Sequence, residues 1–255
     1  MDNHFLAHDF NWDRTPRSGW MHFCNRVLRR LNTGIQLGRR MDGHSEMTNL
    51  EQRLNLWHLC EQVLALNVPG DFAEFGSFDG KTATILGRAL QAHQSIHKSR
   101  ARLHVYDHFQ IGFHLQGRDI RKALEDNFHA VHCPLPQIHD GDFATTIPAE
   151  LPTQLAFVHI DCGYGGEAAE HAATVTRLLE AIYPRMPAGA VCVLMDYWDG
   201  SVCNGPNWNP GAGQAATAFL ASRPEQMVSL YAGEYCHGYF RKSLKPVDAT
   251  TPAEP

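Results

Sequence analysis

Several patterns that would assign the chain to a broad class are missing from its sequence. No stretch approaches the roughly 20 apolar residues of a membrane span, and the start MDNHFLAHDFNWDR has no apolar run of signal-peptide length. We therefore expect a cytoplasmic protein with no membrane partner. No long block of Lys and Arg occurs and the net charge is -5, which argues against nucleic acid as a partner.

Cysteine and histidine are present without the spacing that a disulfide framework or zinc site needs. The seven cysteines include no C-x-x-C pair and are odd in number, so we expect reduced thiols. His129, His132 and Cys133 lie close together, but a structural zinc needs four ligands and no second cluster follows. A serine hydrolase is disfavoured because no G-x-S-x-G elbow occurs.

What the sequence does contain is an alternation of strand and helix patterns after Pro69-Gly70. Strand patterns fit residues 71–75, 103–107, 136–139, 155–160 and 189–195, and helix patterns fit residues 80–93, 118–130, 168–183 and 211–222. This alternation predicts an α/β fold with a doubly wound, mostly parallel sheet. The segment QMVSLYAGEYCHGYFRK predicts two further strands joined at Ala232-Gly233, which form a terminal antiparallel hairpin.

The ends of the chain differ from this central part. Residues 20–40 contain a basic amphipathic stretch that predicts a solvated helix, and TNLEQRLNLWHLCEQVLAL predicts a second N-terminal helix. Thr48 and Glu51 fit a capping box at the start of that second helix. We expect an N-terminal arm or lid over residues 1–44, a main domain over 45–243 and a disordered tail over 244–255.

The segment GDFAEFGSFDG, followed by KTATILGRALQAH, predicts a strand, a glycine turn and a helix, which together form a ligand cradle in open α/β sheets. A phosphate-binding P-loop is disfavoured because one residue too few separates the glycines, and Asp79 would face the phosphates. A dinucleotide site, and hence an NAD-dependent oxidoreductase, is disfavoured because Phe78 stands where the second glycine belongs.

S-adenosylmethionine suits this cradle better, because it carries a sulfonium, an ammonium and two ribose hydroxyls. Glu74 at the end of the first strand can oppose the cationic end of that cofactor. Asp107 ends the second strand, where a carboxylate can accept both ribose hydroxyls.

Several segments together resemble a known family. GDFAEFGSFDGKTA is similar to the first motif of class I S-adenosylmethionine-dependent methyltransferases. The ordered set VYDHFQIGF, IHDGDFATTIP, FVHIDCGYG, LLEAIYPRMPAGAVCVLMDYWDG, NPGAGQAATAFL and GYFRK resembles the macrocin O-methyltransferase (TylF/MycF/NovP-like) family over roughly residues 45–242. The resemblance implies a Rossmann-like methyltransferase domain that acts on hydroxyls of sugars or other natural products.

The resemblance also implies the site residues. The expected cofactor-binding set is Glu74, Phe75, Gly76, Ser77, Gly80, Asp107, Phe109, Asp142 and Phe143. Asp142 matches the position beside the adenine, and Phe143 is expected to pack on that ring. Asp161 and His108 are the candidate catalytic residues, since an imidazole that titrates near neutrality can accept a proton.

The family also binds magnesium near the transferred methyl, and its metal site is similar to HIDCG plus MDY, which implies Asp161 and Asp196 as ligands. Two positions depart from the family pattern, because Gly163 and Met195 stand where acidic residues are usual. The departures leave open weak magnesium binding, metal-free chemistry such as N-methyl transfer, or a catalytically degenerate protein that only binds S-adenosylmethionine. The expected partner is a small-molecule acceptor, and a homo-oligomer stays open.

Overall fold

The computed structural model describes residues 19–34, 47–97, 100–147, 149–163, 166–232 and 235–243. The chain divides into two units, Met1–Met47 and Thr48–Pro255. The predicted disordered tail lies outside the described residues, as does most of the predicted arm or lid.

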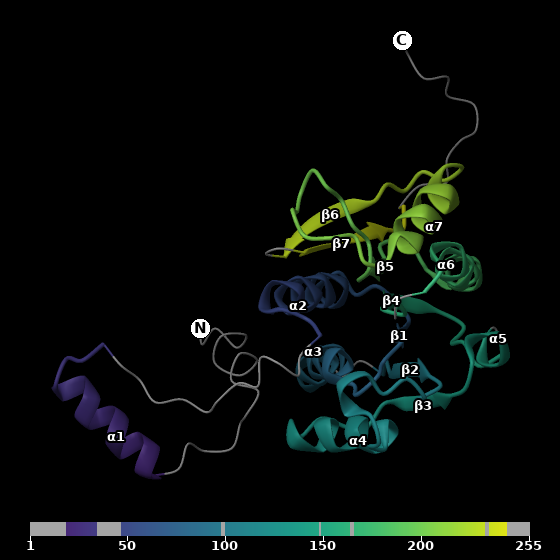
Figure 1. Cartoon of the computed structure of the whole chain (residues 1–255). Coiled ribbons are helices and arrows are strands. Elements are labelled where there is room, and N and C mark those ends of the chain that lie inside the picture. Colours follow the sequence, from purple (N-terminus) through teal and green to yellow (C-terminus); the bar gives the residue numbers. More distant parts are fainter. Residues whose placement is uncertain are drawn as a thin grey trace. The chain divides into compact units, whose positions relative to one another are not determined.

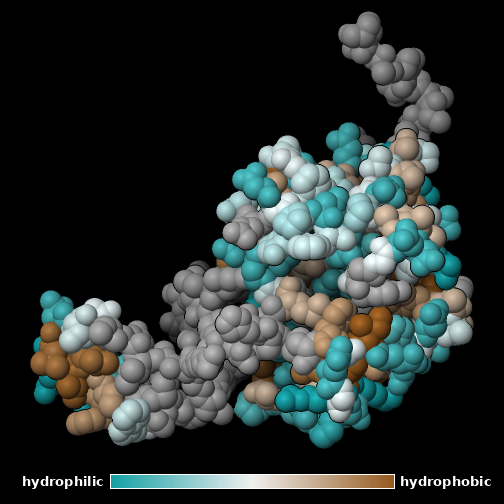
Figure 2. All heavy atoms as spheres, viewed as in Figure 1, coloured by the Kyte–Doolittle hydropathy of each residue, from teal (hydrophilic) through white to brown (hydrophobic). Residues whose placement is uncertain are grey.

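The described part of the first unit is centred on helix α1 (Gly19–Arg30), which ends in the basic pair Arg29 and Arg30. Figure 2 shows apolar side chains gathered on this helix, among them the exposed Phe23 and Val27. The predicted basic amphipathic helix is therefore present.

The second unit alternates strands and helices along the chain. The strands are β1 (Asp71–Phe75), β2 (Leu103–Asp107), β3 (Gln137–Asp140), β4 (Leu155–Ile160), β5 (Val191–Leu194), β6 (Val228–Ala232) and β7 (Tyr235–Arg241). The helices are α2 (Leu50–Ala65), α3 (Lys81–His97), α4 (Ile120–Ala130), α5 (Phe143–Thr146), α6 (Ala168–Ile182) and α7 (Pro210–Leu220), with the short 3-10 turns η2 (Phe113–Leu115) and η3 (Tyr183–Arg185).

The seven strands form one sheet in the order β3-β2-β1-β4-β5-β7-β6. The first five strands pair in parallel, and β7 pairs antiparallel with both β5 and β6. Figure 1 shows α2, α3 and α4 on one side of this sheet and α5, α6 and α7 on the other. The predicted doubly wound, mostly parallel sheet with a terminal antiparallel hairpin is confirmed.

The start of α2 corrects one prediction. The capping box is formed by Asn49 and Gln52, not by Thr48 and Glu51. Asn49 Oδ1 accepts a hydrogen bond from the backbone N–H of Gln52 at 2.9 Å, and Gln52 Oε1 accepts one from the N–H of Asn49 at 2.9 Å. Both registers satisfy the spacing of a capping box, so the pattern alone did not separate them.

Apolar side chains from both helix layers bury the sheet. On the α6 and α7 side the core includes Phe75, Leu178 and Phe219, which are almost fully buried. The central strands β4 and β5 are buried along their whole length, as expected for parallel strands covered on both faces. Among the described residues, no helix has both the length and the apolar content to cross a bilayer.

Candidate functional site

The glycine turn after β1 is shaped by two close approaches. Gly76 has φ +84°, and a Cβ there would lie 1.9 Å from the backbone oxygen of Asp161 at the end of β4. Gly80 has φ +74°, and a Cβ there would lie 2.6 Å from Cγ of Leu124 on α4. Only glycine meets both requirements without strain, which gives the G-x-x-x-G spacing a structural reason.

Asp107 at the end of β2 holds this turn in place. Its Oδ2 accepts a hydrogen bond from the N–H of Phe78 at 2.8 Å, and its Oδ1 accepts one from the N–H of Phe109 at 2.7 Å. Each carboxylate oxygen has two lone pairs, so each can still accept a hydrogen bond from a hydroxyl group of a ligand. The position matches the acidic residue expected to bind the ribose.

Glu74, just before the turn, forms a buried polar contact with His159. Its Oε1 lies 2.8 Å from Nδ1 of His159 on β4, and both side chains are fully buried. Burial raises the pKa of Glu74. Burial would lower the pKa of His159, but the hydrogen bond to Glu74 and the charges of Asp161 and Asp196 raise it. Both shifts favour the protonated form of each group.

Two buried side-chain oxygens lie at the end of β1 and in the glycine turn that follows it. Oε2 of Glu74 and Oγ of Ser77 are buried, the Ser77 hydroxyl lowers the pKa of Glu74, and neither atom has a further hydrogen-bond partner among the described residues. Buried polar groups normally find a partner, so such atoms mark a place where a ligand donates. The ammonium of S-adenosylmethionine is a donor of the right charge for both, and the residues present fit that cofactor.

Asp161 and Asp196 follow β4 and β5 at the same edge of the sheet and are close enough for the charge of one to act on the other. Burial raises the pKa of Asp161 to about 7, and the charge of Asp196 adds to the shift. Burial also raises the pKa of Asp196, although hydrogen bonds from Asn209 and Gly163 oppose it. The two carboxyls therefore influence each other's protonation, and both pKa values lie above the usual range of an aspartate.

Magnesium does not fit the groups around these two carboxyls. Both oxygens of Asp196 already accept N–H hydrogen bonds, from Asn209 at 2.7 Å and from Gly163 at 2.8 Å. Gly163 offers no side chain and Met195 only a soft thioether, whereas magnesium requires hard oxygen ligands. No group of three or more His, Cys, Asp or Glu in the described part of the chain is arranged to hold a metal. The predicted magnesium site is not supported.

Two residues near Asp196 escaped the sequence analysis. Asn209 begins α7, and His171 lies in the first turn of α6 with Nε2 3.7 Å from Oδ2 of Asp196. Burial lowers the pKa of His171, so its imidazole is neutral at pH 7. A histidine in the first turn of the helix after β4 points toward the carboxyl edge of the sheet, and that position was the available signal.

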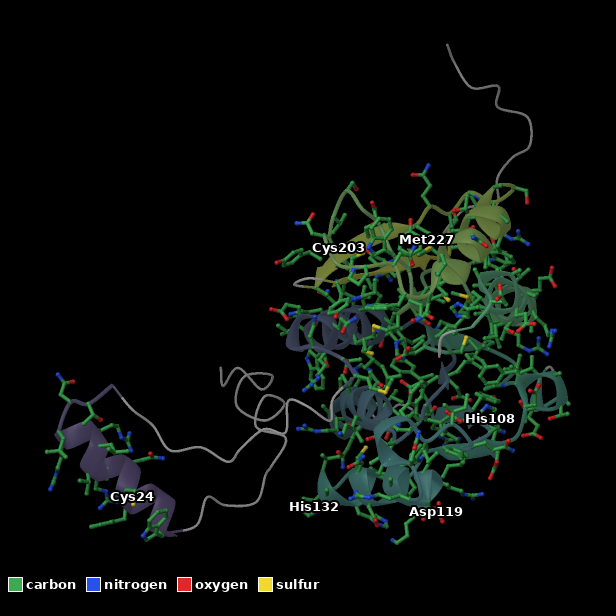
Figure 3. All side chains as sticks on the ribbon, viewed as in Figure 1. Cys24, His108, Asp119, His132, Cys203 and Met227 are labelled. Atoms are coloured by element: carbon green, nitrogen blue, oxygen red, sulfur yellow. The ribbon has the colours of Figure 1, made fainter. Side chains whose placement is uncertain are left out.

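The other predicted residues lie on the β2–β3 side of the site. Figure 3 shows His108 at this end of the sheet. Its Nδ1 accepts a hydrogen bond from the N–H of Gln110 at 3.0 Å. Strands in a sheet are about 4.8 Å apart, so His108 after β2 is roughly two strand spacings, about 10 Å, from the end of β4. Its catalytic role stays a prediction, and its position favours the ribose side.

Asp142 and Phe143 stand at the start of α5. Asp142 Oδ1 caps this helix by accepting a hydrogen bond from the N–H of Ala144 at 2.7 Å. The ring of Phe143 packs edge-on against Phe75, with centroids 5.9 Å apart. Both residues therefore lie beside β1 and β3, where the adenine is expected, and their contact with it stays a prediction.

Comparison with known proteins finds methyltransferases that are similar in sequence and fold. A family model described as "Methyltransferase domain" matches residues 73–197, the stretch from β1 to just beyond β5. A curated relative, 8-demethyl-8-(2,3-dimethoxy-alpha-L-rhamnosyl)-tetracenomycin-C 4'-O-methyltransferase of Streptomyces olivaceus, is 26% identical over 171 residues. The match covers 59% of this chain and 62% of that protein, so the chain spans less than two thirds of the relative's length.

Solved structures share the fold. The O-methyltransferase NovP aligns with a TM-score of 0.60 at 17% identity, over 76% of this chain and 81% of that one. TomG from Streptomyces achromogenes, an O-methyltransferase solved in complex with SAM, aligns with a TM-score of 0.51 at 15% identity, over 92% and 94%. The predicted resemblance to class I methyltransferases of this type is confirmed, and the part of the chain that matches the methyltransferase model is residues 73–197.

Proposed function

We propose that this methyltransferase domain transfers a methyl group from S-adenosylmethionine to a hydroxyl of a small molecule, either a sugar or another natural product. The observation that carries the proposal is the line of groups along the carboxyl edge of the sheet, from Asp107 through the Gly76 turn to Asp161 and Asp196. The similarity to a methyltransferase of a rhamnosyl-bearing compound supports a sugar hydroxyl as the acceptor.

Each part of this edge has a distinct task. Asp107 accepts the ribose hydroxyls, and the unsatisfied oxygens of Glu74 and Ser77 accept from the ammonium. When bound, the cofactor supplies a methyl group activated by a positive sulfonium. Asp161 lies next to the Gly76 turn, because its backbone N–H bonds to the oxygen of Phe75 at 2.9 Å.

Asp161 is also placed to receive the proton. In its ionised form a carboxylate oxygen of Asp161 accepts the hydrogen bond of the acceptor hydroxyl and takes its proton as the oxygen attacks the methyl. A base whose pKa is about 7 suits this step at neutral pH. The protein thus supplies position and a proton acceptor.

The partner is a small molecule, and the compartment we propose is the cytoplasm. The net charge of -5 and the absence of a basic block support a partner other than nucleic acid. The described helices include none that could span a membrane. A homo-oligomer is compatible with all of these observations.

The direct test is turnover with a panel of glycosylated natural products that offer free sugar hydroxyls. We expect release of S-adenosylhomocysteine together with a product heavier by one methylene group. In parallel, calorimetry should detect S-adenosylhomocysteine binding, and Asp107→Ala should weaken it by about 1.5–3 kcal/mol, the value of a hydrogen bond to a charged group. The exposed Asp126→Ala is the matched control. Binding of NAD, with none of S-adenosylhomocysteine, would overturn the proposal.

A second candidate is a protein that binds S-adenosylmethionine without turning it over. Gly163 and Met195, which replace expected acidic residues, favour it. The two candidates separate in one experiment. Tight binding of S-adenosylhomocysteine with no product from any sugar, phenol or amine acceptor supports the second, and product from one of them supports the first.

A further inference from the structure

Asp196 is held by two N–H donors. Its Oδ1 accepts a hydrogen bond from Nδ2 of Asn209 at 2.7 Å, and its Oδ2 accepts one from the backbone N–H of Gly163 at 2.8 Å. An ionised carboxylate only accepts hydrogen bonds, so the NH2 side of the Asn209 amide must face it. The carboxylate is therefore oriented by neutral donors from two separate loops.

The Asn209 side chain contacts Asp196 instead of capping its own helix. It stands at the N-cap of α7, followed by Pro210, and asparagine is among the residues that best cap a helix through the side chain. Here the side chain makes no capping hydrogen bond and turns to Asp196 instead. In this structure the side chain of Asn209 therefore hydrogen-bonds to Asp196 rather than to the first turn of α7.

The amide also fills the space of the expected acidic residue. A Cβ on Gly163 would lie 2.5 Å from Cγ and Nδ2 of Asn209 and 2.5 Å from Oδ2 of Asp196. No side chain fits at position 163 while Asn209 is in place. Gly163 and Asn209 therefore depend on each other. The Asn209 amide occupies the space that an acidic side chain at position 163, a further cation ligand, would need.

We propose that Asn209 is a positioning residue that replaces a divalent cation, so that this site orients Asp196 and the acceptor without magnesium. The inference rests on the proposed function, because it names how that site is organised. It departs from the metal-binding arrangement that the resemblance implied. A cation would have to share the Asp196 oxygens with the N–H donors of Gly163 and Asn209, and in this arrangement it would meet the amide NH2 rather than an oxygen.

The test compares metal binding with turnover. Mn²⁺ binding is measured by electron paramagnetic resonance and Mg²⁺ binding by calorimetry on the full chain, with and without S-adenosylhomocysteine. We expect no cation binding tighter than about 1 mM in the unaltered chain. Asn209→Asp has the same shape and keeps a good N-cap residue, and it adds a third carboxylate. It should bind Mn²⁺ at least about tenfold more tightly.

Turnover supplies the second readout. A chelator should leave the rate of the unaltered chain unchanged, whereas Asn209→Asp should become dependent on added magnesium. Asn209→Ala should raise KM for the acceptor more than it lowers kcat, since it frees Asp196 to move. Asn207→Ala, an exposed neighbour, is the control and should change neither metal binding nor KM.

A second variant covers the case in which Asn209→Asp does not fold. In the double variant Gly163→Asp with Asn209→Ala, the alanine removes the amide and the new aspartate takes its space. This variant should also gain Mn²⁺ binding. Stoichiometric cation binding by the unaltered chain, or failure of both folded variants to gain it, overturns the proposal. Cation and S-adenosylhomocysteine binding are measured without turnover, so loss of the proposed function would be seen separately.

Discussion

Nδ1 of His159 lies 2.8 Å from Oε1 of Glu74, and no part of either side chain reaches solvent. The two residues are neighbours in register on β4 and β1, directly beneath the glycine turn. The second oxygen of Glu74 is buried and has no partner beyond the Ser77 hydroxyl in the described residues. The contact with His159 therefore fixes one carboxyl oxygen in the core, and the other is the one that we propose for the cofactor.

Glu74→Ala should lower the free energy of unfolding by about 3–5 kcal/mol, because it leaves the His159 imidazole buried without its partner. Urea denaturation followed by circular dichroism measures this. The control is Glu180→Ala on the exposed face of α6, which should change stability by less than about 0.5 kcal/mol. Equal effects of the two substitutions would mean that the pair contributes nothing to stability.

His237 on β7 should make the fold sensitive to acid. Burial, together with the nearby charge of His159, lowers its pKa to about 3. The unfolded chain, with a pKa of about 6.5, then binds more protons than the folded one. The stabilising contribution is complete above pH 6.5 and is lost as the pH falls toward 3.

The expected loss attributable to His237 is about 2 kcal/mol between pH 6.5 and pH 5, at 1.36 kcal/mol for each pH unit. Unfolding midpoints at these two pH values measure it. His237→Gln should reduce the loss, while His129→Gln, an exposed histidine, should leave it unchanged. An unaltered pH dependence in His237→Gln would show that another group is responsible.

Gly76→Ala should be much more harmful than Gly117→Ala. Both glycines have similar positive φ angles, +84° and +79°, so alanine pays the same backbone cost of about 1–2 kcal/mol at each. Nothing lies within 4 Å of a Cβ on Gly117, whereas a Cβ on Gly76 would collide with Asp161. The difference between the two variants in the free energy of unfolding therefore measures the cost of the collision with Asp161. The affinity for S-adenosylhomocysteine should fall only for Gly76→Ala. Matching losses at both positions would contradict the close approach of β1 and β4.

The sequence predicted the strands well, because each is a short apolar run bounded by turn residues. Residues 189–195, for example, correspond to Val191–Leu194. The four-residue helix α5 was missed because so short a segment has no helical periodicity. Asn209 was missed for a different reason. In sequence it is an ordinary residue before a proline, and only the folded chain, in which α7 packs against α6, brings its side chain to Asp196.

The sequence could predict which residues follow the strand ends, but not the contacts that loops make there. Asp107, Asp161 and Asp196 could be placed at one edge of the sheet because parallel strands end there, and their roles stay predictions. The magnesium prediction is not supported, because Asp196 accepts hydrogen bonds from two separate loops, which no local pattern encodes. Gly163 was noticed as a departure, but its cause, the position of Asn209, is visible only in three dimensions.

Asp161→Asn should lower kcat by about 10²- to 10⁴-fold, the usual contribution of a general base. The amide keeps the shape of the carboxyl but takes no proton from the acceptor. Affinity for S-adenosylhomocysteine should change little, because Asp107 and the glycine turn hold the cofactor. In the unaltered chain kcat/KM should rise with pH and level off above about 7, as the carboxyl raised by burial ionises.

Initial rates across pH 5–9, with calorimetry of S-adenosylhomocysteine on the same preparations, separate the two effects of this substitution. Asp140→Asn, at the exposed end of β3, is the matched control because it also removes one carboxylate from the carboxyl edge. If Asp161→Asn keeps the full rate and the same pH profile, Asp161 is structural, and the proton acceptor must be sought in the neutral imidazole of His171, 3.7 Å from Asp196.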